Sequence, residues 1–482
     1  MNPIIEKVFS PEHFRQQGHA LIDQLADYLG RVETRQEDIL LPYHRPEVAL
    51  DFWQKDLEKP LLDDASALFE TVINRSIHLH HPRAMGHQVP PPAPMSALAG
   101  LVSNVLNNGT AVYEMGMASN AMERVVTDWM AKHLGFDTKS NGLITSGGTL
   151  ANLTAMLTAR AVKAPTTVWT EGSSDKLAIM VSEQAHYCID RAARIMGLGT
   201  QGIIKVPTDA HYKMRTDLLE EYYQKATAEG LVVFAIVGSC CTTSTGSFDD
   251  LEAVADFAAQ HNLWFHADGA HGGAAIFSKK YREILRGVER ADSVVIDFHK
   301  MMMTPSLATA LIYRNGSDSY HTFQQKAQYL WATTEEDWYS SGKRTFECTK
   351  AILALKIYTL IRLYGEEVFE ANVDTLFDLG KMFAQQIKTR PLFELVVEPE
   401  CNIVCFRVND KSGQNLNDLN AKILQKIIEQ GRFYFVQTTL HNTVYLRVSL
   451  MNPLTNAQDL TELLDTIEQE IIVNHPPELV LA

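Results

Sequence analysis

The chain has 482 residues, of which 46% are hydrophobic and 21% charged, so it is long enough for two or three domains around a sizeable core. This composition excludes a disordered chain, a collagen and a small scaffold held together by disulfides. The formal net charge of −15 argues against a surface that binds nucleic acid or an anionic membrane.

The sequence shows no feature of a secreted or membrane-spanning protein. Met1 to Val8 is short and is followed by a mixed polar helical pattern, and no apolar run reaches about 18 residues. We therefore expect a cytoplasmic protein. The six cysteines form no Cys-x-x-Cys pair, and the neighbours Cys240 and Cys241 are poorly placed to bridge each other, so we expect reduced, structural thiols.

An amphipathic helix is predicted over residues 10–35, because apolar residues recur at helical spacing after a Ser10-Pro11 start. A proline-rich connector follows it up to Pro60. Such a helix either packs against a second subunit or caps its own chain, and the pattern favours neither.

Two clusters of polar side chains follow the connector. His78, His80 and His81 resemble a metal cluster, but no nearby cysteine or carboxylate completes a zinc set, so we favour a polar pocket mouth and expect no metal. Next, prolines stiffen the loop that carries His87 and Gln88, which makes these two residues candidates for substrate contact.

Helical periodicity over residues 97–106 and 118–134 leads to a short strand, a glycine turn and a helix start at 143–152. Backbone N–H groups at such a start, together with the Thr149 hydroxyl, suit a phosphate. The segment is not a P-loop, because no Gly-Lys-Ser/Thr follows Gly148. An ordinary capped helix explains the pattern equally well.

Three later apolar runs end in ionisable residues, as buried parallel strands do where they reach a crevice. They deliver His186, Asp268 and Lys300. The interval between Asp268 and Lys300 matches the roughly 30 residues that a strand, a crossover helix and a returning strand need. A lone histidine is usually structural, but its convergence with Asp268 and Lys300 favours a functional His186.

Residues 197–202 satisfy the dinucleotide fingerprint Gly-x-Gly-x-x-Gly. The fingerprint needs a strand before it and a helix after it, whereas here a helical pattern precedes and a strand pattern follows. We interpret the segment as a turn at the end of a helix.

The alternation of strands and helices predicts an α/β fold with a mostly parallel, doubly wound sheet. A strand is expected at 307–313, an irregular segment typical of a lid or of disorder at 315–345, and helices at 349–364 and 366–388. A small α+β module should follow, with strands 402–408 and 443–450 around a helix at 415–429. We expect a dimer-forming N-terminal segment (1–90), a large domain (91–350) and a small C-terminal domain (351–482).

Together these parts are what pyridoxal phosphate requires: a phosphate-binding helix start, a residue to stack on the ring, a carboxylate for the ring nitrogen and a lysine for the aldehyde. His186, the segment 266–273 and Asp297-Phe298-His299-Lys300 resemble the group II pyridoxal-phosphate-dependent amino acid decarboxylases, the family of glutamate and aromatic amino acid decarboxylases. The resemblance covers about residues 75–365.

The resemblance implies a role for each matching residue. Lys300 would carry the cofactor, Asp268 would pair with the ring nitrogen, and His186 would stack on the ring. Further residues would complete the cofactor site: Gly148, Thr149 and His299 at the phosphate, and Ala270 and Thr242 beside the ring. Asp268 and Lys300 should then lie on opposite sides of the cofactor rather than form an ion pair.

The resemblance also implies a type I fold and a homodimer with active sites at the subunit interface. Tyr329 matches the tyrosine of the catalytic loop, which returns a proton to the α-carbon and favours simple decarboxylation over oxidative deamination.

One position departs from the pattern of glutamate decarboxylases. Lys350 stands where those enzymes have an arginine for the substrate carboxylate, and lysine cannot form the bidentate fork, so Arg344 could replace it. The segments around His87 and Lys350 look more like bacterial 2,4-diaminobutyrate decarboxylases.

We therefore expect a decarboxylase of a small L-amino acid, with 2,4-diaminobutyrate first and lysine, ornithine, glutamate or aspartate behind it. The alternatives are a transaminase or aldehyde synthase with the same cofactor, a nicotinamide-dependent oxidoreductase that uses residues 197–202, and a noncatalytic binding protein.

Overall fold

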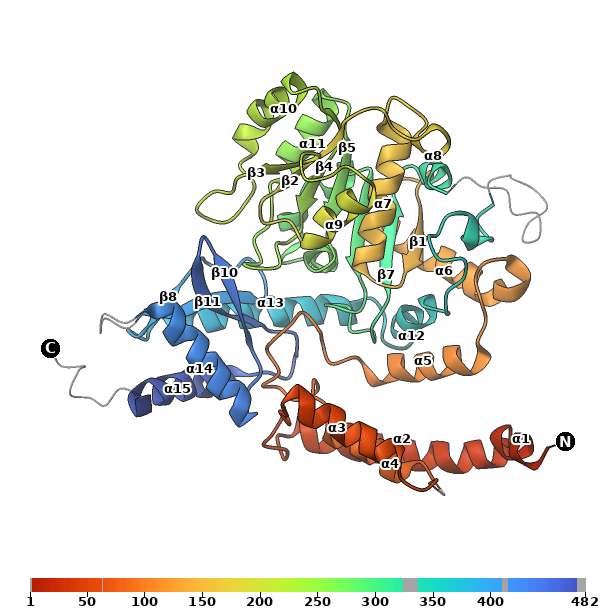
Figure 1. The fold of residues 1–482 in the computed structure, drawn as a ribbon, viewed down its shortest axis with the longest axis vertical. Helices are drawn as coiled ribbons and strands as arrows, with labels where there is room; N and C mark the ends of the chain where they lie inside the picture. Colours follow the sequence, from red (N-terminus) through yellow and green to blue (C-terminus); the bar gives the residue numbers. More distant parts are fainter. Residues whose placement is uncertain (1, 63, 324–336, 410–414, 475–482) are drawn as a thin grey trace. The chain divides into compact units, whose positions relative to one another are not determined.

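The computed structural model describes residues 2–62, 64–323, 337–409 and 415–474. The chain forms two compact units (Figure 1). The central unit comprises Gln88–Ala384 and Val397–Cys405, and the terminal unit comprises Met1–His87, Gln385–Val396 and Phe406–Ala482. The three-part division expected from the sequence stays a prediction. None of the described helices combines the length and the apolar character needed to cross a membrane.

The central unit is built on a seven-stranded sheet with the order β1-β7-β6-β5-β4-β2-β3. The strands from β6 to β3 run parallel, and β7 runs antiparallel between β6 and β1. Five strands are buried at every residue, as their continuous apolar runs predict. The strand bounds are β1 Asn141–Thr145, β2 Leu177–Ser182, β3 Ile203–Val206, β4 Val232–Ser239, β5 Trp264–Asp268, β6 Ser293–Asp297 and β7 Thr309–Tyr313.

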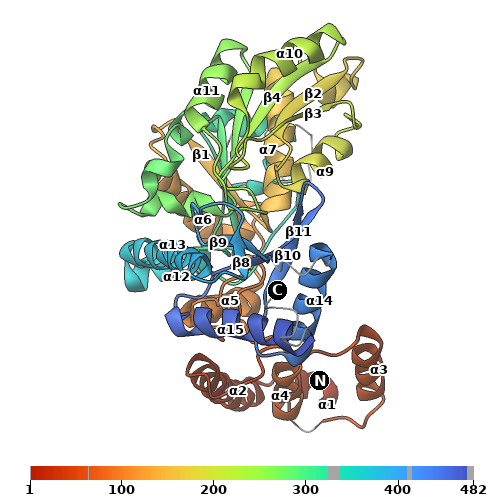
Figure 2. The same ribbon diagram turned by 90° about the vertical axis from the view of Figure 1, so that its left-hand side faces the viewer.

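Helices cover both faces of this sheet (Figures 1 and 2). Helices α7 and α9 pack together against one face and share a single hydrophobic core with the strands. Helix α11 packs on β4 and β5 on the opposite side. The helices of this unit are α5 Pro94–Leu106, α6 Tyr113–His133, α7 Gly148–Lys163, α8 Val168–Glu171, α9 Tyr187–Ile195, α10 Leu219–Ala228, α11 Leu251–Gln260 and α12 Ala354–Tyr364, and α13 (Glu367–Lys388) has residues in both units.

The register of β7 decides which residues meet at one edge of the sheet. Because β7 is antiparallel to both neighbours, β1 and β6 point the same way, and Thr309 lies opposite both Thr145 and Asp297. The glycine turn after β1 and the lysine turn after β6 therefore leave the sheet side by side. The crevice expected from the sequence is formed at this edge.

The Gly-x-Gly-x-x-Gly segment is a turn, as predicted. Helix α9 ends before it and β3 begins after it, and Gly197 and Gly199 have positive φ angles of 80° and 68°. Positive φ suits glycine, which explains this part of the pattern without a bound nucleotide.

The terminal unit combines the N-terminal helices with the C-terminal module. Helix α2 (Pro11–Glu33) is capped by Ser10, which confirms the predicted N-terminal helix. In the four-stranded sheet of the order β10-β11-β9-β8, β10 pairs antiparallel with β11 and β8 antiparallel with β9. The remaining bounds are α1 Pro3–Val8, α3 Pro46–Leu57, α4 Ser66–Asn74, β8 Phe393–Leu395, β9 Ile403–Val408, α14 Leu416–Gln430, β10 Val436–Leu440, β11 Thr443–Ser449 and α15 Ala457–Asn474.

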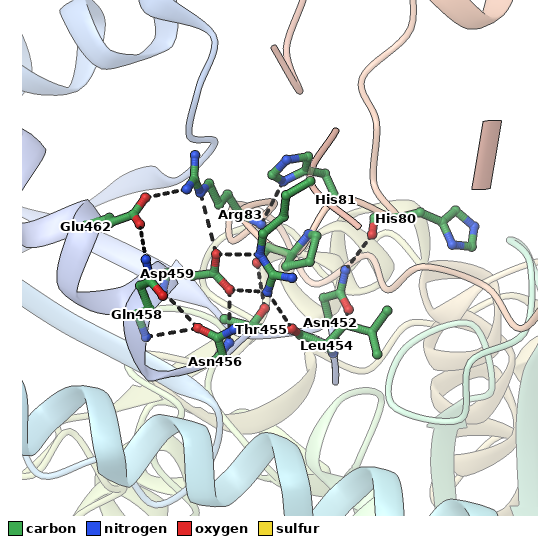
Figure 3. Close-up of polar contacts among 12 residues, drawn as sticks. His80, His81, Arg83, Asn452, Leu454, Thr455, Asn456, Gln458, Asp459 and Glu462 are labelled. Atoms are coloured by element: carbon green, nitrogen blue, oxygen red, sulfur yellow. Dashed lines mark hydrogen bonds and ion pairs between the residues drawn. The ribbon is translucent and has the colours of Figure 1, made fainter. Parts of the chain in front are cut away.

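A polar network ties the segment after α4 to the start of α15 within the terminal unit (Figure 3). Arg83 forms ion pairs with Glu462 and, at 3.5 Å, with Asp459, and the Asn452 side chain donates a hydrogen bond of 3.0 Å to the His80 carbonyl oxygen. Burial is the main reason why the pKa of His81 falls to about 4. The histidine-rich segment thus contributes contacts that hold this unit together.

Candidate active site

A cavity of about 290 Å³ lies in the central unit where β1, β5 and β6 end. Its lining includes most of the residues that the sequence singled out: Gly148, Thr149, His186, Asp268, Ala270, His299 and Lys300. Sequence reasoning did not assign its other lining residues, which are Ser146, Gly147, Asn152, Cys241, Thr243, His271, Asp297 and Leu307. A larger hollow of about 510 Å³ in the same unit contains none of the predicted site residues.

Lys300 forms an ion pair with Asp297, the last residue of β6. Their Nζ and Oδ2 atoms are 2.9 Å apart, and Thr309 donates a 2.5 Å hydrogen bond to the other carboxylate oxygen. Burial would raise the pKa of Asp297, but Lys300 and His299 outweigh it and lower that pKa. Burial would lower the pKa of Lys300, but Asp297 outweighs it and raises that pKa. Both groups are therefore charged at neutral pH.

Asp297 is the functional residue that sequence reasoning missed most clearly. It stands three residues before the lysine in the same turn, a spacing that lets a carboxylate reach the amine. Among the residues the structure describes, Lys300 has its ion pair with Asp297 and none with Asp268. Asp268 thus remains available to another cation.

Asp268 is held by a chain of hydrogen bonds that begins in the core. Asn152 donates through Nδ2 to Asp268 Oδ2 (3.3 Å), and the Asn152 Oδ1 atom lies 2.7 Å from His266 Nε2. His266 Nδ1 lies 2.8 Å from the Ser293 hydroxyl, which accepts a hydrogen bond from Trp264.

In this series of hydrogen bonds, each residue donates to the next one in the direction of Asp268. Since Asn152 Oδ1 only accepts, His266 Nε2 must carry the ring proton, and Nδ1 must accept from Ser293. Complete burial lowers the pKa of His266 to about 4, which keeps the imidazole neutral and preserves this order. The Asp268 carboxylate is thus oriented by uncharged hydrogen-bonding partners.

The start of α7 forms a cradle for an anion. The first N–H groups of a helix have no partner within the helix, and Gly148 and Thr149 present theirs here. Gly147 has a φ of 117°, and a Cβ atom added to Gly148 would lie 3.1 Å from Asp297 Oδ1. A side chain at Gly147 would strain the turn, and one at Gly148 would crowd the Asp297 carboxylate.

Two histidines complete the wall. His186 caps α9, accepts a hydrogen bond of 3.4 Å from the Cys188 amide through Nδ1, and has its pKa lowered mainly by burial, so its ring is neutral. His299 Nδ1 lies 3.0 Å from the Ala308 carbonyl oxygen, and its Nε2 lies 3.7 Å from Asp297 Oδ2. A neutral ring, an anion cradle, a carboxylate and a lysine on one cavity fit pyridoxal phosphate.

Several predicted site residues lie outside the cavity lining. The Thr242 hydroxyl forms a hydrogen bond with the Thr245 hydroxyl and accepts another from the Ser247 amide. The neighbouring residue Thr243 lines the cavity instead. Lys350 is buried in an ion pair of 2.6 Å with Glu123 and also donates to the Ile144 carbonyl oxygen.

The other predicted substrate residues are also placed elsewhere or not described. Arg344 is buried over the Tyr320 ring and donates to the Gly142 carbonyl oxygen at 3.1 Å. His87 is exposed in the terminal unit, and Gln88 begins the central unit. Tyr329 lies outside the described residues. The substrate contacts of all these residues stay predictions.

Comparison with known proteins identifies the family. The model of the pyridoxal-dependent decarboxylase conserved domain matches residues 43–409, which is more than half of the chain. The chain belongs to this family. It is a pyridoxal-phosphate-dependent amino acid decarboxylase with a type I fold, as the sequence predicted.

Individual relatives of this decarboxylase differ in the substrate for which they are named. It is 27% identical to the aromatic-L-amino-acid decarboxylase of Bacillus atrophaeus over 97% of this chain and 98% of that one. It is also 27% identical to the L-2,4-diaminobutyrate decarboxylase of Acinetobacter baumannii over 84% and 82% of the two chains. The apo crystal structure of mouse CSAD matches with a TM-score of 0.87 and 25% identity over 95% and 99%.

Proposed function

We propose that this decarboxylase converts L-2,4-diaminobutyrate to 1,3-diaminopropane and CO₂, with lysine, ornithine, glutamate and aspartate as weaker candidates. The charge of the cavity supports a basic substrate. Among its described lining residues, Lys300 alone carries a primary amine or guanidinium, whereas Asp268 and Asp297 are both carboxylates. A substrate with an acidic side chain would need a second cation in this wall, but a side-chain ammonium group would not.

The cofactor roles follow the positions of the cavity residues. When bound, pyridoxal phosphate supplies an aldehyde for the substrate amine and a ring that accepts the electrons released as CO₂ leaves. Lys300 would hold the aldehyde carbon, and His186 would lie against the ring with Ala270 and either Thr242 or Thr243 nearby. The amides of Gly148 and Thr149, with His299, would hold the phosphate.

Proton control would fall to the carboxylates and to Tyr329. Asp268, fixed by the chain from Ser293 through His266 and Asn152, would keep a proton on the ring nitrogen. Asp297 would hold the Lys300 ammonium group in place and charged through their ion pair. Tyr329 would return a proton to the α-carbon.

The test is a screen for CO₂ release over the common and diamino acids, with the product amines identified by mass. We expect the highest kcat/KM for L-2,4-diaminobutyrate. A kcat/KM at least about tenfold higher for glutamate, aspartate or an aromatic amino acid would overturn the substrate assignment, since tenfold corresponds to about 1.4 kcal/mol of transition-state binding. Ammonia or peroxide released with CO₂ would indicate an aldehyde synthase, and a requirement for a keto acid would indicate a transaminase.

We further propose that the enzyme is a cytoplasmic homodimer with active sites at the interface. Apolar side chains exposed along the first helices support a partner surface. Helix α2 buries only Val32 among its residues, while Phe14 and Ile22 remain 58% and 42% exposed.

A further inference from the structure

A cluster of two cysteines and one histidine stands at the edge of the cofactor cavity and has no part in the proposed reaction. Cys241 follows β4, His271 follows β5, and Cys401 lies in the segment Val397–Cys405 of the same central unit. We propose that Cys241, His271 and Cys401 form a binding site for a thiophilic divalent cation such as Zn²⁺.

The spacing of the ligand atoms suits one metal ion. The two Sγ atoms and a ring nitrogen of the histidine all lie within 4.8 Å of one another. The Sγ atoms of Cys241 and Cys401 are 3.7 Å apart. Two thiolates bound at about 2.3 Å to a tetrahedral Zn²⁺ lie about 3.8 Å from each other, so the pair already has the required separation.

His271 is oriented as a metal ligand. Its side chain is only 3% exposed, and its Nε2 lies 2.8 Å from Asn402 Oδ1, which can only accept a hydrogen bond. The proton therefore sits on Nε2, and Nδ1 carries a lone pair. This Nδ1 atom is buried, makes no hydrogen bond of regular geometry with a described residue, and interacts with the nearby Cys401 thiol. Histidines that bind metals donate their other N–H to an oxygen acceptor in this way.

The fourth position of the metal would open toward the cofactor cavity. Three protein ligands leave one corner of a tetrahedron for water or another small ligand. Cys241 and His271 both line the cavity, whereas Cys401 does not. Since the three residues are widely separated in the sequence, no ligand spacing revealed them, and the sequence predicted no metal.

Cobalt binding to the reduced holoenzyme tests this site. Protein treated with a chelator and kept in a phosphine reductant is titrated with Co²⁺, and difference spectra report tetrahedral, thiolate-bound cobalt. We expect about one Co²⁺ per chain, displaced by Zn²⁺. Cys401→Ser should weaken binding at least about tenfold and abolish the thiolate-to-cobalt band, since a thiolate ligand is lost. The matched control is Cys348→Ser, because Cys348 is an exposed cysteine outside the cluster, and its spectrum should equal that of the wild type.

A second variant separates ligand loss from misfolding. Asn402→Ala removes the acceptor of the His271 N–H group but leaves all three ligands in place, and we expect a 10–100-fold lower affinity with the cobalt band retained at saturation. The cofactor absorbance and the thermal midpoint of each variant report whether it is folded. The proposal is overturned if the wild type, with all thiols reduced, shows no thiolate-bound cobalt, or if folded Cys401→Ser binds Co²⁺ as tightly and with the same spectrum.

Discussion

At the scale of single residues, the cavity uses two aspartates in different ways. Asp297 lies against Lys300 at 2.9 Å and is 97% buried, so each group keeps the other charged. Asp268 is held through neutral partners, Asn152 and His266. One carboxylate therefore controls the charge of the lysine, and the other stays available to the cofactor.

The Lys300–Asp297 pair predicts how two substitutions differ. Lys300→Ala should abolish covalent cofactor attachment and activity. Asp297→Asn should retain attachment but lower kcat about 100-fold, because the lysine is no longer held in position by its ion pair. Without Asp297, burial lowers the Lys300 pKa, so attachment should extend to lower pH. Borohydride trapping followed by mass spectrometry measures attachment, and absorbance measures its pH dependence.

Lys300→Arg is the matched control for this pair, because it keeps the positive charge beside Asp297 but cannot attach the aldehyde. Its melting temperature should be close to that of the cofactor-free wild type, and it should be inactive. If Lys300→Ala or Lys300→Arg turned over substrate at the wild-type rate, the assignment of Lys300 would be wrong.

At the scale of elements, the first helices present apolar faces that their own unit does not cover. In α2, a 23-residue amphipathic helix, Phe14 and Ile22 are exposed. We expect the double variant Phe14→Asp, Ile22→Asp to shift the enzyme from dimer to monomer at micromolar concentration, because buried charges without partners cost several kcal/mol at an interface. Light scattering coupled to size-exclusion chromatography measures the mass.

Gln16→Asp serves as the control for the helix, because Gln16 is exposed on the side opposite to Phe14. It should leave the mass unchanged. A wild-type protein that is monomeric, or a double variant that remains fully dimeric, would contradict the proposed role of α2.

The strands that deliver the site could be predicted from the sequence, because short continuous apolar runs rich in β-branched residues are typical of buried strands. The predicted strand 307–313 is β7, Thr309–Tyr313. The pattern could not show that β7 is antiparallel, nor that its register sets Thr145 and Asp297 opposite one residue. Register depends on pairing between distant segments, which the pattern of one strand does not reveal. The contacts of Asn152 with Asp268 and of Cys401 with Cys241 likewise join segments far apart in the sequence.

Short elements of the C-terminal module were missed for a different reason. Strand β10 (Val436–Leu440) alternates between half-buried and exposed residues up to the buried Leu440, and it contains two threonines and a glutamine, so it lacks a clear apolar face. Strand β8 has three residues, too few for a period to be recognised. These elements are defined by their partners in the sheet rather than by their own sequence.

At the scale of the whole molecule, buried neutral histidine makes the stability of the fold depend on pH. His266 is fully buried with a pKa of about 4, against an ordinary value near 6.5 in the unfolded chain. Between these two values the unfolded chain binds more protons than the folded one, so stability falls as the pH is lowered through this window. Asp249 acts in the opposite direction below pH 6, because burial raises its pKa to about 6.

Comparison of the wild type with His266→Asn separates the effect of His266 on stability from that of Asp249, because Asp249 is present in both proteins. Between pH 7 and pH 5 we expect the unfolding free energy of the cofactor-free wild type to fall by about 2 kcal/mol more than that of His266→Asn. Urea unfolding followed by circular dichroism measures this difference, with His19→Asn on the exposed surface of α2 as the control that should track the wild type. If His266→Asn lost as much stability as the wild type over this range, His266 would already be protonated in the fold. The donor order from Ser293 to Asp268 would then be wrong, since a charged imidazole could not accept the Ser293 proton.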